Sequence, residues 1–163
     1  MSLSGRRSRQ NVPAMDGVKA ADLLAVPVRL RGIQLGRPVD LILDPDRRRV
    51  LGFDVRCGDD ERRFLPLAAT KVDERQLTIA SPLVLLEEAQ LAFYTDRGST
   101  FAALHGSDVA RGDDVVGTLE DLELAPDGTI STVVVATGTG SRRVAYGDDV
   151  QIGAFRRRVR AAS

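Results

Sequence analysis

Hydrophobic and polar residues alternate along most of this chain, and short turn signals separate the alternating stretches. A period of two is the pattern of strands that bury one face. The first half predicts strands at Val26–Leu30, Leu35–Leu43, Val50–Val55, Arg62–Pro66 and Leu77–Ile79. The second half predicts strands at Val115–Leu124, Thr129–Thr137, Arg142–Tyr146 and Val150–Ile152. Closely spaced short strands of this kind predict a mainly β fold built as small barrels or sandwiches.

Two segments have a helical character instead. Pro82–Leu91 predicts a short linker helix, because Ser81 is a suitable cap and Pro82 is favoured at the first helical position. Val18–Leu24 predicts a single helical turn that leads into the first strand.

The two halves of the chain repeat each other. Turn residues, core residues and a pair of arginines share one frame, which predicts a duplicated module. A shift of 81 positions places Val28, Gly36, Asp40, Leu41, Leu43, Pro45 and Asp46 on Val109, Gly117, Asp121, Leu122, Leu124, Pro126 and Asp127. A shift of 80 then places Val50, Val55, Gly58, Arg62 and Arg63 on Ile130, Val135, Gly138, Arg142 and Arg143. The period is too long, and the copies too few, for a solenoid.

The repeat divides the chain into five parts. These are a basic tail, a first module, a linker with a short helix, a second module and a basic C-terminal tail, at residues 1–19, 20–81, 82–103, 104–153 and 154–163.

The repeated residues resemble the PRC-barrel family. The first module carries the family's pattern at Gly36–Leu41, Asp44–Asp46 and Arg63–Leu67. The second carries it at Gly117–Leu122 and Pro126–Gly128, whereas Arg143–Gly147 departs from the family's Pro-Leu element. The resemblance covers roughly residues 20–155 and implies two small, highly curved PRC-type β-barrels.

The resemblance also implies a role. The family includes the cytoplasmic domain of the photosynthetic reaction-centre H subunit and the C-terminal half of a bacterial ribosome-maturation factor, where it resembles a protein-docking module. We therefore expect a non-enzymatic protein-binding or scaffold module with an unknown protein partner.

Charge is distributed unevenly along the chain. Residues 21–152 hold 15 basic and 22 acidic side chains, while the two ends are basic. The end arginines are Arg6, Arg7, Arg9, Arg156, Arg157, Arg158 and Arg160. A compact nucleic-acid-binding domain would instead concentrate positive charge on its folded face. The basic ends nevertheless support an alternative function, an accessory factor that contacts RNA or the ribosome through these arginines.

No group of residues in the sequence matches a known catalytic motif. His105 is the only histidine and lacks an obvious orienting acid. Cys57 is the only cysteine, and Arg56 beside it points to the opposite face of its strand. Gly138–Ser141 lacks the lysine of a phosphate-binding loop, and the paired acids Asp59–Glu61, Asp113–Asp114 and Asp148–Asp149 lack the spacing of a calcium loop. We therefore expect no catalytic residues, metal or cofactor.

Asp40 and Asp121 stand out because aspartate is disfavoured inside a strand, yet both occupy the same place in the repeat. Two adjacent arginines are repeated as well. We expect Asp40 to pair with Arg62 or Arg63, and Asp121 with Arg142 or Arg143. Such structural ion pairs would fix the strand register.

The remaining expectations concern location and assembly. A single cysteine, no long apolar run and no secretory signal predict a cytoplasmic protein. The linker is rich in apolar residues, so we expect these residues to pack between the modules and any surplus to support a homodimer. They are Leu83, Val84, Leu85, Leu86 and Leu91.

Overall fold

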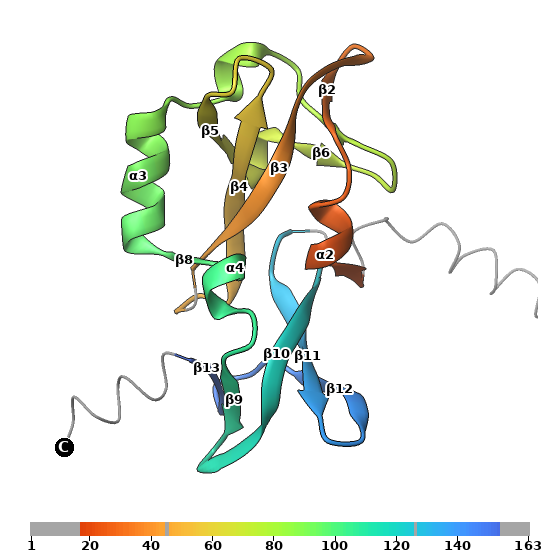
Figure 1. Ribbon diagram of the computed structural model, residues 1–163, viewed down its shortest axis with the longest axis vertical. Helices are drawn as coiled ribbons and strands as arrows, with labels where there is room; N and C mark the ends of the chain where they lie inside the picture. The colour runs from red at the N-terminus through yellow and green to blue at the C-terminus, as the bar shows by residue number, and fades with distance from the viewer. Residues whose placement is uncertain (1–16, 45, 126, 154–163) are drawn as a thin grey trace, which may run out of the picture.

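The computed structural model describes residues 17–44, 46–125 and 127–153, and most of its regular structure is β-strand (Figure 1). The strands form two sheets, one from each half of the chain. The predicted mainly β fold is therefore confirmed.

The first sheet has seven strands. Six come from the first half: β2 (Val28–Leu30), β3 (Ile33–Asp44), β4 (Arg49–Cys57), β5 (Arg62–Pro66), β6 (Lys71–Val72) and β7 (Leu77–Thr78). Their order is β5-β4-β3-β2-β7-β6, and the seventh strand, β8 (Ser99–Thr100), pairs with β3. A short 3-10 helix, η1 (Leu67–Ala69), joins β5 to β6.

The second sheet has six strands. Five come from the second half: β9 (Asp108–Arg111), β10 (Asp114–Leu124), β11 (Ile130–Thr137), β12 (Gly140–Ala145) and β13 (Val150–Ile152). Their order is β12-β11-β10-β9-β13, and β1 (Val18–Lys19) pairs with β10. β5-β4-β3-β2-β7 and β12-β11-β10-β9-β13 are therefore the same order.

Gly36 and Gly117 occupy equivalent positions in the two sheets, as the shift of 81 predicts. A Cβ on Gly36 would lie 2.5 Å from the carbonyl oxygen of Arg56. A Cβ on Gly117 would lie 2.4 Å from the carbonyl oxygen of Ala136, 80 positions beyond Arg56. Only glycine allows the long hairpin strands to approach this closely. Each central strand also has a bulge three residues further on, at Val39 and Glu120.

The shift of 80 does not hold for the arginines: Arg62 lies opposite Arg56 and Ser141 lies opposite Ala136, so Arg62 corresponds to Ser141 and not to Arg142.

The expected closed barrels are not found. In the part of the chain that the structure describes, no strand pairing joins the two outer strands of either sheet. Closure requires every outer strand to find a partner in its own sheet. The outer edge of β5 instead forms an isolated bridge in which Phe64 and Leu86 exchange backbone hydrogen bonds of 3.0 and 2.8 Å.

The two halves exchange their first elements. β1 and the following turn α2 (Ala20–Leu23) pack on the second sheet, whereas β8 and α4 (Phe101–Leu104) pack on the first (Figure 1). Val18 pairs with Leu124, and Ser99 pairs with Leu43. Adding 81 to Val18 gives Ser99, and adding 81 to Leu43 gives Leu124, so the two pairings are equivalent in the repeat. The structural boundaries consequently differ from those expected at 20–81 and 104–153. One body is residues 28–104, and the other is residues 108–152 completed by residues 18–24.

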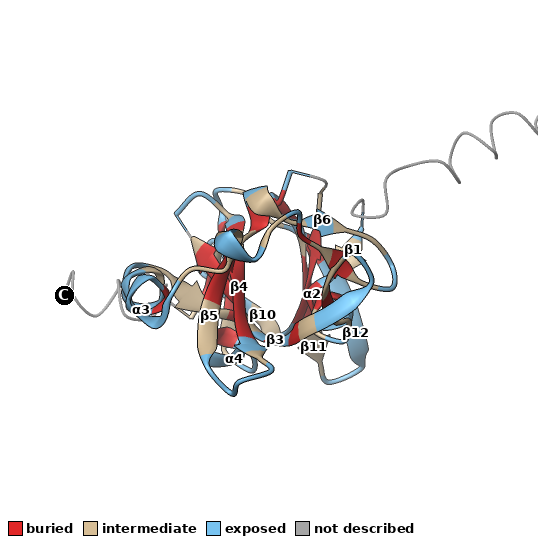
Figure 2. Ribbon diagram, turned by 90° about the horizontal axis from the view of Figure 1, so that it is seen from above, coloured by how far each residue is buried: buried red, intermediate tan, exposed pale blue. Residues whose placement is uncertain are grey.

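One hydrophobic core runs through both sheets. Figure 2 shows the buried residues on the inward sides of the strands. The main cluster joins Leu43 and Val50 of the first sheet to Leu124 and Ile130 of the second. The inner faces of the sheets thus cover each other directly, and they are almost entirely aliphatic.

The apolar linker residues do not all pack between the modules as expected. Val84 and Leu85 pack against the main cluster that joins both sheets, whereas Leu86 and Leu91 belong to a separate cluster. Pro82–Val84 is a short 3-10 helix, η2, on which Leu83 is 86% exposed. The longer helix is α3 (Glu88–Arg97), further along the chain than expected. Leu91 of α3 joins Ile42 and Phe64 in a separate small cluster on the outer face of the first sheet. Ser81 does cap η2, since its hydroxyl accepts a hydrogen bond of 3.1 Å from the Leu83 N–H.

Candidate functional site

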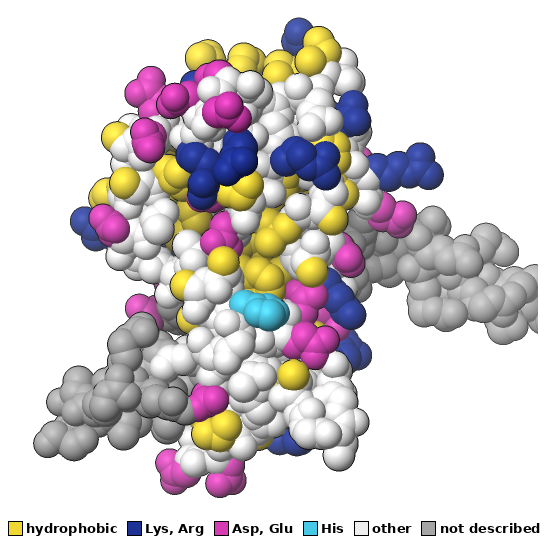
Figure 3. Space-filling view, in the orientation of Figure 1, with side chains coloured by type: hydrophobic (Ala, Val, Ile, Leu, Met, Phe, Trp, Pro, Cys, Tyr) yellow, Lys and Arg dark blue, Asp and Glu magenta, His cyan; other side chains and the backbone are white. Residues whose placement is uncertain are grey.

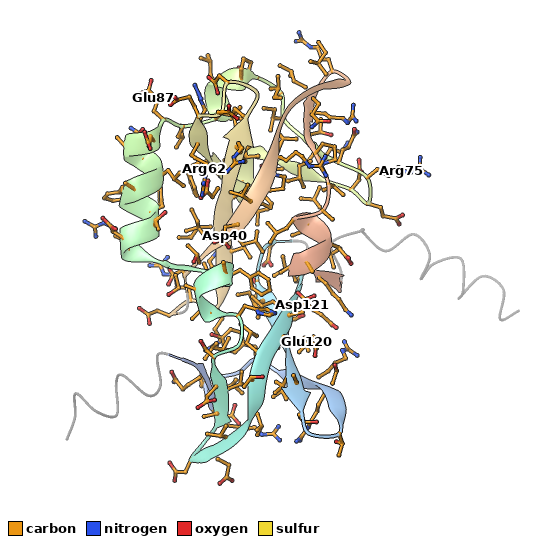
Figure 4. The ribbon with its side chains drawn as sticks, in the orientation of Figure 1. Asp40, Arg62, Arg75, Glu87, Glu120 and Asp121 are labelled. Carbon is orange, nitrogen blue, oxygen red and sulfur yellow. The ribbon has the colours of Figure 1, made fainter. Side chains whose placement is uncertain are left out.

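Asp40 and Asp121 do not form the expected ion pairs. The Oδ1 atom of Asp40 accepts hydrogen bonds from the N–H groups of Leu41 (2.8 Å) and Ala102 (3.0 Å). The Oδ1 atom of Asp121 accepts equivalent bonds from Leu122 (2.8 Å) and Ala21 (3.2 Å). Figure 4 shows Asp40 beside α4 and Asp121 beside α2. Each carboxylate therefore holds the helical turn contributed by the other half of the chain.

Arg62 and Arg143 have other acidic partners. Arg62 binds both carboxylate oxygens of Asp54, with 2.7 Å between Nε and Oδ1. Arg143 binds both carboxylate oxygens of Glu123, at 2.9 and 2.6 Å. The hydrogen bonds that Arg62 donates to Asp54 are the main cause that raises the pKa of Arg62, and the charge of Asp40 adds to it.

The strand register explains why Arg62 pairs with Asp54 and not with Asp40. Asp40 lies opposite Asp54, and Asp54 lies opposite Phe64, while Arg62 lies one row away on the same face. Of the remaining predicted residues, Arg63 pairs with Asp59 at 3.2 Å in a partly exposed contact, and Arg142 is exposed on β12.

Three arginines form a row across the first sheet. Arg37 of β3 lies opposite Arg56 of β4, and Arg56 lies opposite Arg62 of β5. Arg37 and Arg56 are exposed. Like charges directly opposite each other are unfavourable in a sheet; here Arg62 is paired with Asp54, and Arg37 donates a hydrogen bond to the Ala25 carbonyl oxygen. We call Arg37, Arg56 and Arg62 the arginine row.

The second sheet has no such charge at the same place. Its equivalent row is Thr118, Ala136 and Ser141 on β10, β11 and β12. Ser141 donates a hydrogen bond of 2.6 Å to Glu120, so the nearest charge there is acidic. The same order of strands therefore forms without the arginines, although β7 runs parallel to β2 whereas β13 runs antiparallel to β9.

A shallow hollow of about 500 Å³ lies beside the arginine row. Arg37 and Arg56 line it together with the acidic Asp60, and its apolar lining includes Leu35 and Val39 beside the buried Pro38. Val39 is the bulged residue of β3 and is 38% exposed. The bulge turns an apolar side chain toward solvent beside two positive charges.

Charge also differs between the two repeats. Residues 18–78 contain 12 basic and 10 acidic side chains, whereas residues 99–152 contain 3 basic and 9 acidic side chains. Figure 3 shows basic groups gathered on the half of the visible face that carries the first sheet, with acidic groups near the histidine. The arginine row thus stands out against a chain body that is acidic as a whole.

The other candidate residues lie apart from this site or at its edge. His105 follows α4, is exposed, and its ring packs edge-on against Phe101. Cys57 ends β4 at the rim of the hollow, and burial is the main cause that raises the pKa of its thiol. Thr137–Gly140 forms the turn between β11 and β12, as expected of a hairpin and not of a phosphate loop. Among the described residues, no group of three His, Cys, Asp or Glu side chains is placed to hold a metal ion.

The seven end arginines, Arg6, Arg7, Arg9, Arg156, Arg157, Arg158 and Arg160, lie outside the described residues. Within the described residues, every helix is too short or too polar to cross a membrane.

Sequence reasoning missed Arg37, Arg56, Asp54 and Glu123. A usable signal for the first two was present in the repeat itself. Arg37 and Arg56 fall on Thr118 and Ala136 when the halves are aligned, so a charge present in one copy is absent from the other. Positions that differ in this way are candidates for function, whereas shared positions report the fold.

Comparison with known proteins does not assign the chain to a family. No protein-family pattern matches it, and no curated protein shows detectable sequence similarity to it.

Proposed function

We propose that this chain is a non-enzymatic protein-binding module that docks an acidic, partly apolar segment of a partner protein on the arginine row and its hollow. The arginine row is the observation that carries the proposal. Arg37 and Arg56 are exposed and oppose each other, while the equivalent Thr118 and Ala136 are uncharged. Selection for stability alone would not place two positive charges there.

The hollow supports a peptide-like occupant rather than a simple anion. Its rim supplies two guanidinium groups, which suit carboxylates in a bidentate geometry. Its wall supplies Leu35 and Val39, which an apolar side chain of the partner would cover. Buried apolar contact surrounded by polar contacts is the usual composition of a protein interface.

We further propose that both halves derive from one PRC-type module by duplication. The shared strand order, the equivalent Gly36 and Gly117 contacts and the equivalent bulges support this origin. The docking role expected from the resemblance to that family is consistent with a binding site that only one copy carries. In this proposal the second copy has a structural role.

A defined peptide tests the proposal. The probe is a fluorescein-labelled 12-residue peptide that alternates Glu with Leu and Val. A second peptide carries Gln in place of every Glu. The test variant is Arg37→Thr with Arg56→Ala, which installs the residues that the second sheet has at these positions and therefore preserves the fold. Fluorescence anisotropy should show that the variant binds the acidic peptide at least about tenfold more weakly, as expected for the loss of two charge-assisted contacts.

Two controls accompany this measurement. Arg75→Thr with Arg111→Ala changes the net charge equally at exposed positions outside the site, and it should bind like the original chain. A single-stranded oligouridine measures the alternative, contact with RNA. If the acidic and Gln peptides bind equally weakly, or if only the RNA depends on Arg37 and Arg56, the protein-docking proposal is refuted.

A further inference from the structure

The contact between the two bodies is built from two copies of the same docking site. One site lies on the second sheet and holds β1 and α2, and the other lies on the first sheet and holds β8 and α4. In each site a two-residue strand pairs with the end of a long central strand. An aspartate that follows a bulge then accepts the N–H of the second residue of the helical turn, Ala21 in one site and Ala102 in the other. We call residues 18–24 the N-terminal segment.

The site on the second sheet recognises its segment mostly through the backbone. Val18 and Lys19 pair with Leu124 and Glu123, and the Gly17 N–H donates a 3.0 Å hydrogen bond to the Leu124 carbonyl oxygen. The side-chain contribution comes from Ala20 and Leu23, whose exposed fractions are 0% and 2%. All of these contacts would form equally well with the same segment of another molecule.

The chain crosses between the two bodies at two equivalent places. Residues 25–27 lead from the N-terminal segment to β2, and residues 105–107 lead from α4 to β9. A hollow of about 240 Å³ lies beside the first crossing, between Leu23, Ala25, Val26 and the turn at Asp73 and Glu74, while Val26 also packs against the main cluster. Pro27 also restricts Val26 to extended conformations, which favours an opened crossing.

We infer that the N-terminal segment is an exchangeable docking element, and that its partner is a second copy of this chain. In the exchanged form, the N-terminal segment of each molecule occupies the Asp121 site of the other molecule. The contacts of the N-terminal segment in the Asp121 site are kept, so the two forms differ in effective concentration and at residues 25–27, whose conformation and contacts change, among them the Arg37–Ala25 hydrogen bond. A closed two-fold dimer results, with no site left empty.

Effective concentration sets when the dimer forms. A short crossing holds the segment at a local concentration on the order of millimolar, so the closed monomer dominates in dilute solution. The dimer should therefore accumulate when the chain is refolded near millimolar concentration. This behaviour does not require a partner on the arginine row, although Arg37 of that row also contacts the crossing at Ala25.

A disulfide across the docking site distinguishes the two forms. Cys57→Ser removes the native thiol, and Lys19→Cys with Glu123→Cys places a cysteine pair at opposite positions of β1 and β10. The closed molecule forms this disulfide within one chain, and the exchanged dimer forms it between chains. Two versions of the chain, one with an N-terminal tag that increases its length, are refolded together and oxidised. Mixed-length covalent dimers on a non-reducing gel then report exchange.

The expected result is a covalent dimer fraction that rises roughly tenfold between about 0.1 and 1 mM, as mass action requires while the dimer is the minor form. The control pair is Thr132→Cys with Ala145→Cys, which joins neighbouring strands of one hairpin and should stay within one chain at every concentration. Disulfides confined to single chains at about 1 mM would overturn the inference, whether or not a non-covalent dimer is present.

A variant without new cysteines gives a second test. Deleting Ala25 and Val26 removes the turn by which the chain doubles back before Pro27, so the N-terminal segment can no longer reach its own second sheet. Light scattering should find this variant dimeric across the whole concentration range. A folded monomer would also overturn the inference.

Discussion

Arg49 and Thr129 lie opposite each other in an antiparallel bridge where the hairpins of the two sheets cross. They are also the same position in the two repeats, 80 residues apart. The flanking hydrogen bonds follow the same symmetry: Val50 N–H donates to the Gly128 carbonyl and Ile130 N–H donates to the Arg48 carbonyl, both at 2.8 Å. A residue can face its own equivalent only on a two-fold axis. The bridge therefore lies on an approximate two-fold axis that relates the two halves of the chain.

We expect Asp121→Ala to lower the free energy of unfolding by about 2 kcal/mol, because the N–H groups of Ala21 and Leu122 lose their acceptor in a buried place. Asp40→Ala should have a smaller effect, because Asp40 is only half-buried and water can replace it. Urea denaturation measures both values. Asp121→Asn keeps an acceptor oxygen and should recover most of the loss. An Asp121→Ala midpoint equal to that of the original chain would contradict the docking role of the carboxylate.

The two bodies should unfold together, because one hydrophobic core joins them. The chain has no Trp and only two Tyr, and each Tyr belongs to a different body. Tyr94 stacks on Phe64 of the first sheet, and the Tyr146 N–H donates to Ser131 of the second half. Tyrosine fluorescence of Tyr94→Phe and Tyr146→Phe therefore follows one body at a time. After correction for the stability of each variant, the two denaturation midpoints should coincide; separate midpoints would show two independent bodies.

Cys57 should react slowly with iodoacetamide at pH 8, because burial raises the pKa of its thiol and the thiolate is the reactive form. Asp59 also raises this pKa and Arg63 lowers it. Asp59→Asn should therefore speed the reaction, and Arg63→Gln should slow it. Equal rates for folded and urea-unfolded protein would contradict this expectation.

The raised pKa of Cys57 also affects stability. Since the folded state holds the thiol proton more tightly than the unfolded state, the stability contributed by this group is present at low pH. It is lost as pH rises above the ordinary thiol pKa.

Arg37 connects the arginine row to the N-terminal crossing, since its Nη2 atom donates a 3.1 Å hydrogen bond to the carbonyl oxygen of Ala25. Arg37→Thr removes this bond from the closed monomer. Each dimer forms from two closed monomers that both lose this bond, so a loss of about 1 kcal/mol in each should raise the fraction of exchanged dimer roughly thirtyfold in the disulfide assay while the dimer is the minor form. Arg75→Thr serves as the control, because Arg75 is exposed on the turn after β6. An unchanged dimer fraction would show that Arg37 does not hold the crossing.

Local pattern was enough to locate most strands, since alternation and turn residues act within a few positions. The expected strand at Thr129–Thr137 corresponds to β11, and the one at Val50–Val55 to the centre of β4. The linker helix was misplaced because Pro82 and Ser81 begin a turn that ends at Leu85, while α3 is defined by its packing on Ile42 and Phe64. That packing depends on residues far away in the sequence.

The outer faces of the two sheets also depend on contacts between residues that are distant in the sequence. Ile42 and Phe64 are apolar because α3 covers them, whereas Glu123 and Arg143 lie at the corresponding places of the second sheet and pair with each other in its outer surface. Once the structure is known, the repeat explains this difference. From the sequence, the arginine pairs suggested bonds to Asp40 and Asp121, because the bulges at Val39 and Glu120 that set the rows were not visible.

The sequence by itself located most of the strands, the turns and the glycines at close approaches, because these depend on neighbouring residues and on a frame that both halves share. It missed β9, and it aligned Arg62 with Arg142 where the strand pairing aligns it with Ser141. The tertiary structure alone decided which half each segment completes. Val18–Leu23 and Ser99–Leu104 could each have packed on the sheet of their own repeat with the same local pattern. The choice rests on the energy of the joined core, on Asp40 and Asp121 as acceptors, and on the directions that residues 25–27 and 105–107 take. Contacts between residues 62 and 100 positions apart cannot be read from a periodicity of two.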